Sequence, residues 1–142
     1  GLTYFAASRL TALRDCGLLT SYAGIKPEKV LDALRLMLKT IVKLREKPLP
    51  EKEVKQLKVF HRQAMETMLE IPYQAATWLA TNVFRGGKAD FESYISDIDT
   101  VSPQTVRNTT NKLLTPSRLA LSVAGTPPSG QKLRNIMKEE TE

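Results

Sequence analysis

The sequence predicts an α+β protein in which an antiparallel sheet packs against a layer of helices. Two runs near the N-terminus alternate in the period-two manner of strands, and five stretches after them carry apolar residues at helical spacing. One further alternating run follows the helices. Strands and helices therefore do not alternate along the chain, and this order favours α+β over a parallel α/β fold.

The composition is that of an ordinary soluble globular domain. The chain has 142 residues, of which 42% are hydrophobic and 25% charged, enough apolar material for one core. The longest apolar stretch, residues 31–44, is interrupted by Asp32, Arg35, Lys39 and Lys43. No run approaches the ~18 apolar residues that suggest a membrane helix, so we expect no membrane span.

The first two strands are predicted over residues 2–10 and 18–25. The segment Arg14-Asp15-Cys16-Gly17 breaks the alternation between them, so the two runs read as an antiparallel pair joined by a turn. Gly24 lies inside the second run, where a glycine weakens a strand and often marks a close approach of other atoms.

Five helices are predicted after the hairpin. The first begins at Pro27-Glu28 and ends before Pro48, the second runs from about Glu51 to Glu70, and Ser102-Pro103 starts the fifth. Their apolar stripes predict the buried faces. The stripe of the first helix is Val30, Leu34, Met37, Ile41 and Leu44, widened by Leu31 and Leu38, and that of the second is Val54, Leu57, Phe60, Ala64, Met68 and Ile71. The later stripes are Tyr73, Ala76, Thr77, Ala80 and Phe84 in the third helix; Phe91, Tyr94, Ile95 and Ile98 in the fourth; and Val106, Leu113 and Leu114 in the fifth.

The C-terminal part is predicted to contain one more strand and then a tail. Residues 117–124 alternate Leu119, Leu121 and Val123 with smaller or polar residues. Residues 126–142 are expected to be a linker and a charged tail, with a short helix as the alternative. Three short strands make a thin sheet for so many helices, so we expect the domain to lack an N-terminal portion.

Residues able to hold a catalytic metal are scarce. His61 is the only histidine and Cys16 the only cysteine, whereas catalytic zinc takes three protein ligands. His61 sits beside the predicted stripe of the second helix and is interpreted as a packing residue. Glu66 and Glu70 are interpreted as a solvated face, and Cys16 as an incidental thiol in a turn. We expect no catalytic residue, no metal site and no cofactor in this chain.

The net charge of +6 permits binding to nucleic acid or another anionic surface. The distribution of the charges favours solvent-exposed helix faces over such a binding surface. Lysines and arginines are mixed with glutamates along two helices, and aromatic residues do not interleave with them. We expect no nucleic-acid partner; a basic nucleic-acid-binding helical module remains an alternative. Trp78, Tyr73 and Phe84 are interpreted as core or interface aromatics.

Several strings, in order, resemble the second domain of processing-peptidase (insulinase/pitrilysin) zinc proteases over nearly all of residues 1–125. They are Gly1-Leu2-Thr3-Tyr4, the run Leu18 to Gly24 ending in Tyr-Ala-Gly, the Pro27-Glu28 helix start, Leu69-Glu70-Ile71-Pro72, Phe84-Arg85-Gly86-Gly87, Val101-Ser102-Pro103 and Leu119 to Gly125. Each string alone is common, and their order and spacing give the resemblance its specificity.

The resemblance implies a non-catalytic domain that builds the substrate chamber and binds peptide opposite a zinc-bearing domain or subunit. The family's second domain contributes an Arg and a Tyr, and Tyr4 matches the Tyr, while the Arg would precede Gly1. The zinc is expected in the partner. Other relatives imply an alternative, a non-proteolytic structural or assembly subunit. Family members occur in bacterial periplasm, cytoplasm or mitochondria, and the sequence does not separate these. The exposed sheet edge leads us to expect self-association.

Overall fold

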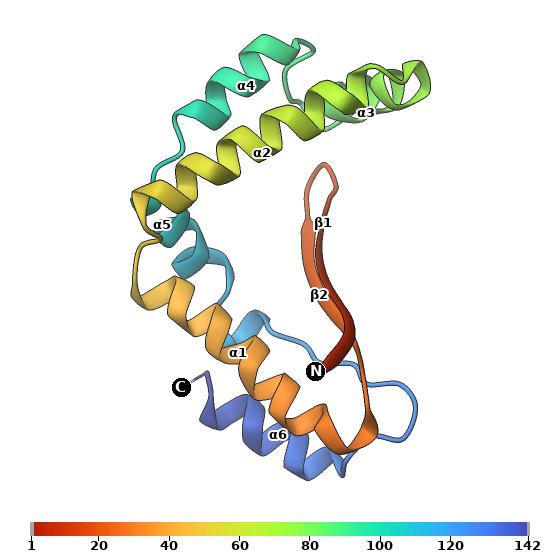
Figure 1. The fold of residues 1–142 in the computed structure, drawn as a ribbon, viewed down its shortest axis with the longest axis vertical. Coiled ribbons are helices and arrows are strands. Elements are labelled where there is room, and N and C mark those ends of the chain that lie inside the picture. The colour runs from red at the N-terminus through yellow and green to blue at the C-terminus, as the bar shows by residue number, and fades with distance from the viewer. Residues whose placement is uncertain (1, 142) are drawn as a thin grey trace. The chain divides into compact units, whose positions relative to one another are not determined.

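The fold class predicted from the sequence is confirmed. In the computed structural model, which describes residues 2–141, a two-stranded antiparallel sheet is followed by helices (Figure 1). The elements are β1 (Thr3–Ala12), β2 (Gly17–Ile25), the 3₁₀ turn η1 (Pro27–Lys29), α1 (Val30–Glu46), α2 (Glu51–Leu69), α3 (Pro72–Phe84), α4 (Phe91–Asp99), α5 (Pro103–Leu113), the 3₁₀ turn η2 (Pro116–Arg118) and α6 (Gly130–Glu139).

The chain forms two compact units. The first unit comprises residues 1–10, 19–48 and 107–142, and the second comprises residues 11–18 and 49–106. The first therefore holds most of the hairpin, α1, the end of α5 and α6. The second holds the tip of the hairpin, α2, α3, α4 and the start of α5.

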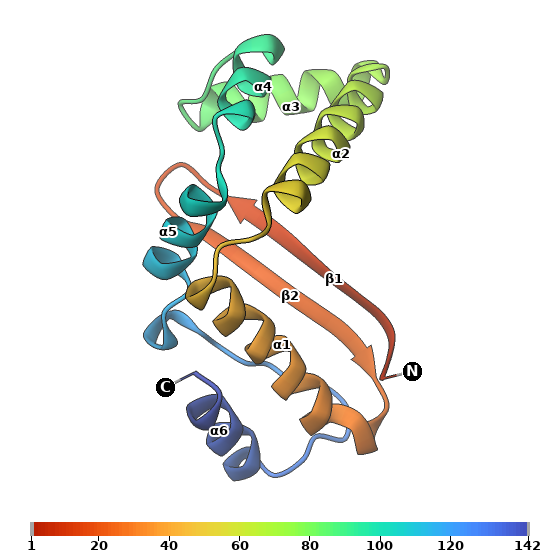
Figure 2. The ribbon, with the colours of Figure 1, turned by 60° about the vertical axis from the view of Figure 1, so that its left-hand side comes forward.

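The β1–β2 hairpin forms where the alternation predicts it. The amide of Leu13 donates to the carbonyl of Cys16 at 2.8 Å and closes the turn, and the two strands run side by side (Figure 2). An isolated two-stranded hairpin is only marginally stable in water. Most residues of both strands are exposed, and the hairpin has two edges that no described strand pairs.

Helix starts follow the capping residues in the sequence. Pro72 occupies the first turn of α3, where its missing N–H has no helical partner in any case. The side chains of Asp90, Ser102 and Ser129 accept hydrogen bonds from backbone amides three residues on, at the starts of α4, α5 and α6. Each satisfies one of the amides that a helix start leaves unpaired.

The core of the first unit lies between α1 and α6. Leu34, Leu38 and Ile136 form a buried cluster, and Ile136 of α6 is only 3% exposed. Of the predicted stripe of the first helix, Leu34 is buried and the other members are partly buried, whereas the flanking Leu38 is buried. Of the two expectations for the C-terminal segment, the short helix is the one that forms, because residues 130–139 are α6 and pack on α1. A short helix can pack with few apolar residues when these residues lie on one face of the helix.

The buried face of α2 differs from the predicted stripe. Val54 and Met65 are buried, but Leu57 and Phe60 are 52% and 71% exposed. The helix turns toward α3 and α4 a face that also carries His61. The predicted stripe of α2 is the more apolar one, but it is not the face that packs. Polar residues on the packed face have hydrogen-bond partners in α4.

The predicted strand over residues 117–124 is absent from the described structure. Pro116–Arg118 form the turn η2, and the amide of Leu119 donates to Pro116 O at 3.2 Å. Leu119 is extended, at φ −87° and ψ 134°, but residues 119–124 are not part of the two-stranded sheet. The predicted strand is therefore wrong: alternation indicates an extended run, but a strand also needs a neighbouring strand edge to pair with.

Candidate functional site

The register of the hairpin determines which side chains share a face. Ser8 Oγ lies 2.8 Å from Ser21 Oγ, so these residues stand opposite each other on the same side of the sheet. Because side chains alternate along a strand, Tyr4 and Ala6 lie on this face as well. The same alternation along β2 adds Leu19. We call Tyr4, Ala6, Ser8, Leu19 and Ser21 the serine face.

Tyr4 lies at the open end of the hairpin on the serine face. Its side chain is 74% exposed. A phenol in this position presents both a ring and a directed hydroxyl donor to whatever approaches the face. The residue that the sequence singled out is thus exposed.

The opposite face of the hairpin is aromatic. Phe5 and Tyr22 make an edge-to-face contact with ring centroids 6.2 Å apart. A Cβ added to Gly24 would run into the ring of Phe5, so glycine makes room for this ring. Gly24 was predicted to mark a close approach, and the approaching group is a side chain.

A largely apolar cavity of about 460 Å³ borders the serine face within the first unit. The hairpin, α1, the segment 114–121 and Met137 of α6 line it. From the hairpin, the lining includes Ser8 and Ser21 of the serine face and also Ala7 and Tyr22 of the other face. None of the lining residues is charged. The site therefore combines an exposed phenol, a strand edge and an apolar hollow.

His61 is a packing residue, as the sequence suggested. Its Nε2 lies 3.2 Å from the hydroxyl of Tyr94, and Trp78 packs on Tyr94 with ring centroids 5.5 Å apart. Burial raises the pKa of the Tyr94 hydroxyl above its ordinary value. Glu66 and Glu70 are exposed on α2, and Cys16 is exposed in the hairpin turn.

Cations of α2 are paired with the end of α4. Arg62 donates to Asp99 Oδ2 at 2.9 Å, and Lys58 Nζ donates to the carbonyl of the same residue at 2.7 Å. The carbonyl falls in the last turn of the helix, where a cation is favoured. Sequence reasoning missed this cluster because its partners are 37 and 41 residues apart.

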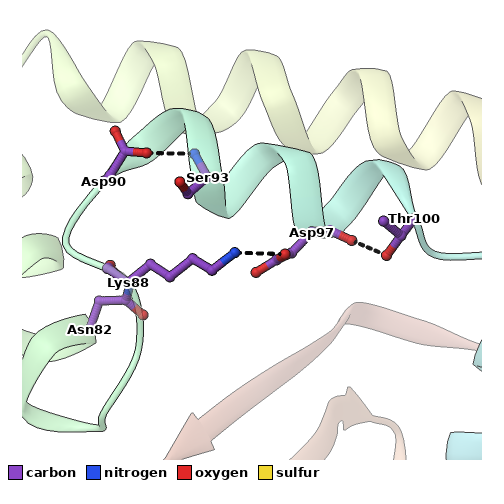
Figure 3. Close-up of polar contacts among 6 residues, drawn as sticks. All are labelled: Asn82, Lys88, Asp90, Ser93, Asp97 and Thr100. Atoms are coloured by element: carbon purple, nitrogen blue, oxygen red, sulfur yellow. Dashed lines mark hydrogen bonds and ion pairs between the residues drawn. The ribbon is translucent and has the colours of Figure 1, made fainter.

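Polar contacts also organise both ends of α4 (Figure 3). Asp90 accepts from the amide of Ser93 at 2.8 Å, and Lys88 Nζ donates to Asp97 Oδ1 at 2.9 Å. The hydroxyl of Thr100 donates back to the carbonyl of Asp97. Hydrogen bonds from Ser93 are the main reason that the pKa of the Asp90 carboxyl lies below its ordinary value.

Of the three aromatic residues predicted to lie in the core or at an interface, one is partly buried and two are exposed. Trp78 is half-buried beside Tyr94, whereas Tyr73 and Phe84 are 81% and 74% exposed. The third helix turns Ala75 and Trp78 inward, so the predicted stripe of Tyr73, Ala76, Thr77, Ala80 and Phe84 was wrong.

Two features are absent from residues 2–141. Within this range, no three or more His, Cys, Asp and Glu side chains come together in a way that would hold a metal ion. No helix in the same range combines the length and the apolar character that crossing a bilayer requires.

Comparison with known proteins identifies the N-terminal part of the chain. Residues 1–59, which include the hairpin, α1 and the start of α2, match the family model of the peptidase M16 inactive domain. This segment is similar to the M16 inactive domain. The predicted resemblance to the non-catalytic domain of such peptidases is therefore confirmed, over a shorter stretch than residues 1–125. No curated protein matches the chain.

Over residues 1–59, the match supports a non-catalytic domain of a metallopeptidase-type protein. Tyr4 and the serine face lie inside the matched segment. The cavity was not predicted, because its walls come from segments separated by about a hundred residues. The clue that the sequence did offer was the row of small residues Ala6, Ala7 and Ser8 in β1.

Proposed function

We propose that this M16-like domain forms part of a substrate chamber and binds unfolded peptide opposite a zinc-bearing domain or subunit. In this arrangement the partner holds the zinc and performs hydrolysis, while this chain orients the peptide. The observation that carries the proposal is the position of Tyr4, exposed at the open end of the hairpin on the face that borders the uncharged cavity.

Tyr4 has a specific task in this proposal. Its hydroxyl donates a hydrogen bond to a carbonyl oxygen of the bound peptide. As water attacks that carbonyl in the partner's site, the oxygen gains negative charge and the hydrogen bond becomes stronger. A donor directed at such an oxygen contributes about 10²-fold or more to the rate in a site that excludes water.

The first test uses the chain alone. A fluorescein-labelled unfolded peptide is titrated with wild type, Tyr4→Phe and the control Tyr73→Phe, which alters an exposed tyrosine of the second unit. One lost hydrogen bond should weaken binding about threefold to tenfold in Tyr4→Phe. The control should bind like wild type. Equal affinities for all three proteins would remove Tyr4 from the site.

A second test uses the assembled peptidase. Tyr4→Phe should lower kcat by about 10²-fold, with a much smaller change in KM, because the bond strengthens in the transition state. A chain that assembles stably with its partner but binds no peptide would instead be a structural subunit. Binding to DNA that falls steeply with salt would favour the nucleic-acid alternative.

A further inference from the structure

We propose that the solvent-facing side of α2 pairs antiparallel with the same side of α2 in a second copy of the chain, about a two-fold axis. The occupant of this surface is thus another copy, and the contact lies within the second unit. It is independent of peptide binding by the hairpin. We call this surface the α2 seam and define it by six residues at alternating spacings of four and three: Lys52, Gln56, Val59, Gln63, Glu66 and Glu70.

The α2 seam has the spacing of a contact between two paired helices. Spacings of four and three residues keep side chains on one stripe of a helix, which is the geometry of a coiled-coil contact. All six residues are exposed, so no other part of residues 2–141 covers them. Val59 and the neighbouring Phe60 lie near the middle of the stripe, 52% and 71% exposed, beside a shallow hollow of about 440 Å³. The seam therefore presents an apolar centre to solvent.

The two ends of the α2 seam carry opposite charges. Lys52 and the flanking Lys55 make the N-terminal end basic, and Glu66 and Glu70 make the C-terminal end acidic. The seam is also symmetric in position, because its members lie two, five and nine residues before residue 61 and two, five and nine residues after it. A two-fold axis opposite residue 61 therefore brings the basic end of each copy against the acidic end of the other.

This arrangement pairs charges that have no partner within one copy. Lys52 faces Glu70 of the second copy, Lys55 faces Glu66 of the second copy, and the two-fold axis repeats both pairs. None of these four side chains forms an ion pair with another residue of the range 2–141. A parallel pairing would instead place like charges together, which is unfavourable. The charges therefore select the antiparallel orientation.

A second copy satisfies both ends of the seam, whereas a partner of one charge satisfies only one. A nucleic acid would meet Glu66 and Glu70 as well as the lysines. The 19 residues of α2 span roughly 28 Å. One pair of helices of this length makes a small interface, and exposed ion pairs add little to it. We therefore expect a weak dimer whose population rises with protein concentration.

Variants with a seam of one charge test the proposal by sedimentation equilibrium. Every protein carries Leu10→Lys to suppress association through the hairpin edges. The acidic variant has Lys52→Glu and Lys55→Glu, and the basic variant has Glu66→Lys and Glu70→Lys. Each variant alone places like charges across the axis, so its dimer dissociation constant should rise about tenfold or more. Mixed together, the two should form a heterodimer at least as tight as the dimer of the parent chain.

A matched pair of controls changes the same net charge away from α2. Lys26→Glu with Lys132→Glu replaces two exposed lysines, and Glu46→Lys with Glu139→Lys replaces two exposed glutamates. Each control alone should dimerise like the parent chain, and mixing the two should give no gain. Heterodimers of equal strength from the control mixture and the seam mixture would show general charge attraction and would overturn the proposal.

Phe60→Ser tests the apolar centre of the seam. Phe60 lies one residue from the centre of the stripe, so the rings of the two copies meet near the axis. Its loss should weaken the dimer about tenfold, as expected for an aromatic residue at the centre of an interface. Phe84→Ser, which removes a ring that is 74% exposed in α3, should leave the dimer unchanged.

The outcomes decide the proposal without reference to peptide binding. Circular dichroism should show the same helix content in all variants, because every substituted side chain is exposed. Association that is lost in each seam variant and restored on mixing supports the antiparallel pairing. A parent chain that stays monomeric at all concentrations, or seam variants that dimerise like the parent, would contradict it.

Discussion

Ser8 Oγ and Ser21 Oγ lie 2.8 Å apart across the hairpin, and this pair determines which side chains share a face with Tyr4. A slip of one residue would move every side chain to the other face. Tyr4, Ala6 and Ser8 would then exchange places with Phe5 and its neighbours. The proposed role of Tyr4 therefore depends on the register of this hairpin.

Gly24→Ala tests the register directly. The added Cβ would displace the ring of Phe5 and disrupt its contact with Tyr22, a contact of a kind that contributes ~0.5–1.5 kcal/mol. We expect a loss of stability of about that size in urea unfolding. Phe5→Ala alone should cost a similar amount, and the double variant should be no worse than Phe5→Ala. Fully additive losses would show that Phe5 does not lie over Gly24.

Ile136→Ala tests the packing of α6 on α1. This side chain is 3% exposed in the core of the first unit, and truncating such a residue costs about 2–5 kcal/mol. Hydrogen exchange should show faster exchange of the amides of α6, whereas the exposed control Lys132→Ala should leave them protected. If Ile136→Ala matched the control, residues 126–142 would be the charged tail expected from the sequence.

The stability of the N-terminus of α4 should depend on pH at the acidic end. The pKa of Asp90 is lowered in the folded protein, chiefly by the hydrogen bonds from Ser93. Its contribution is thus complete above the unfolded pKa, ~3.9, and declines as the pH falls through the lower folded value.

Hydrogen exchange at the Ser93 amide measures this effect. Protection in wild type should decrease below about pH 4. Asp90→Asn keeps an acceptor oxygen without a titrating group, so its protection should not depend on ionisation at this position. The same acid-induced loss in wild type and Asp90→Asn would exclude Asp90 as its cause.

Self-association through the unpaired edges of the hairpin is a further prediction. Apart from Arg9, neither strand carries a charged residue, and uncharged edges readily pair with other chains. Sedimentation velocity should show dimers that increase with protein concentration. Leu10→Lys, in β1, should reduce them, whereas Val83→Lys, on the exposed surface of α3, should not. A monomer at all concentrations would contradict the prediction.

Local patterns predicted local structure well. The alternation around Tyr4 and Ser21 predicted both strands, and capping residues such as Ser102 predicted helix starts, because these signals act within a few residues. Burial was predicted less well. Phe60 lies on the more apolar stripe of α2 but is exposed, since the packed face is chosen by partners in α4 far along the chain. The cavity depends on such distant contacts too.

Metal analysis combined with a peptidase assay tests the central claim most directly. The purified chain is supplied with zinc, passed through a desalting column and measured for bound metal, for peptide binding and for hydrolysis of the same labelled peptide. The account predicts peptide binding without stoichiometric zinc and without cleavage until a zinc-bearing partner is added. One tightly held zinc per chain, together with cleavage by the chain alone, would contradict it.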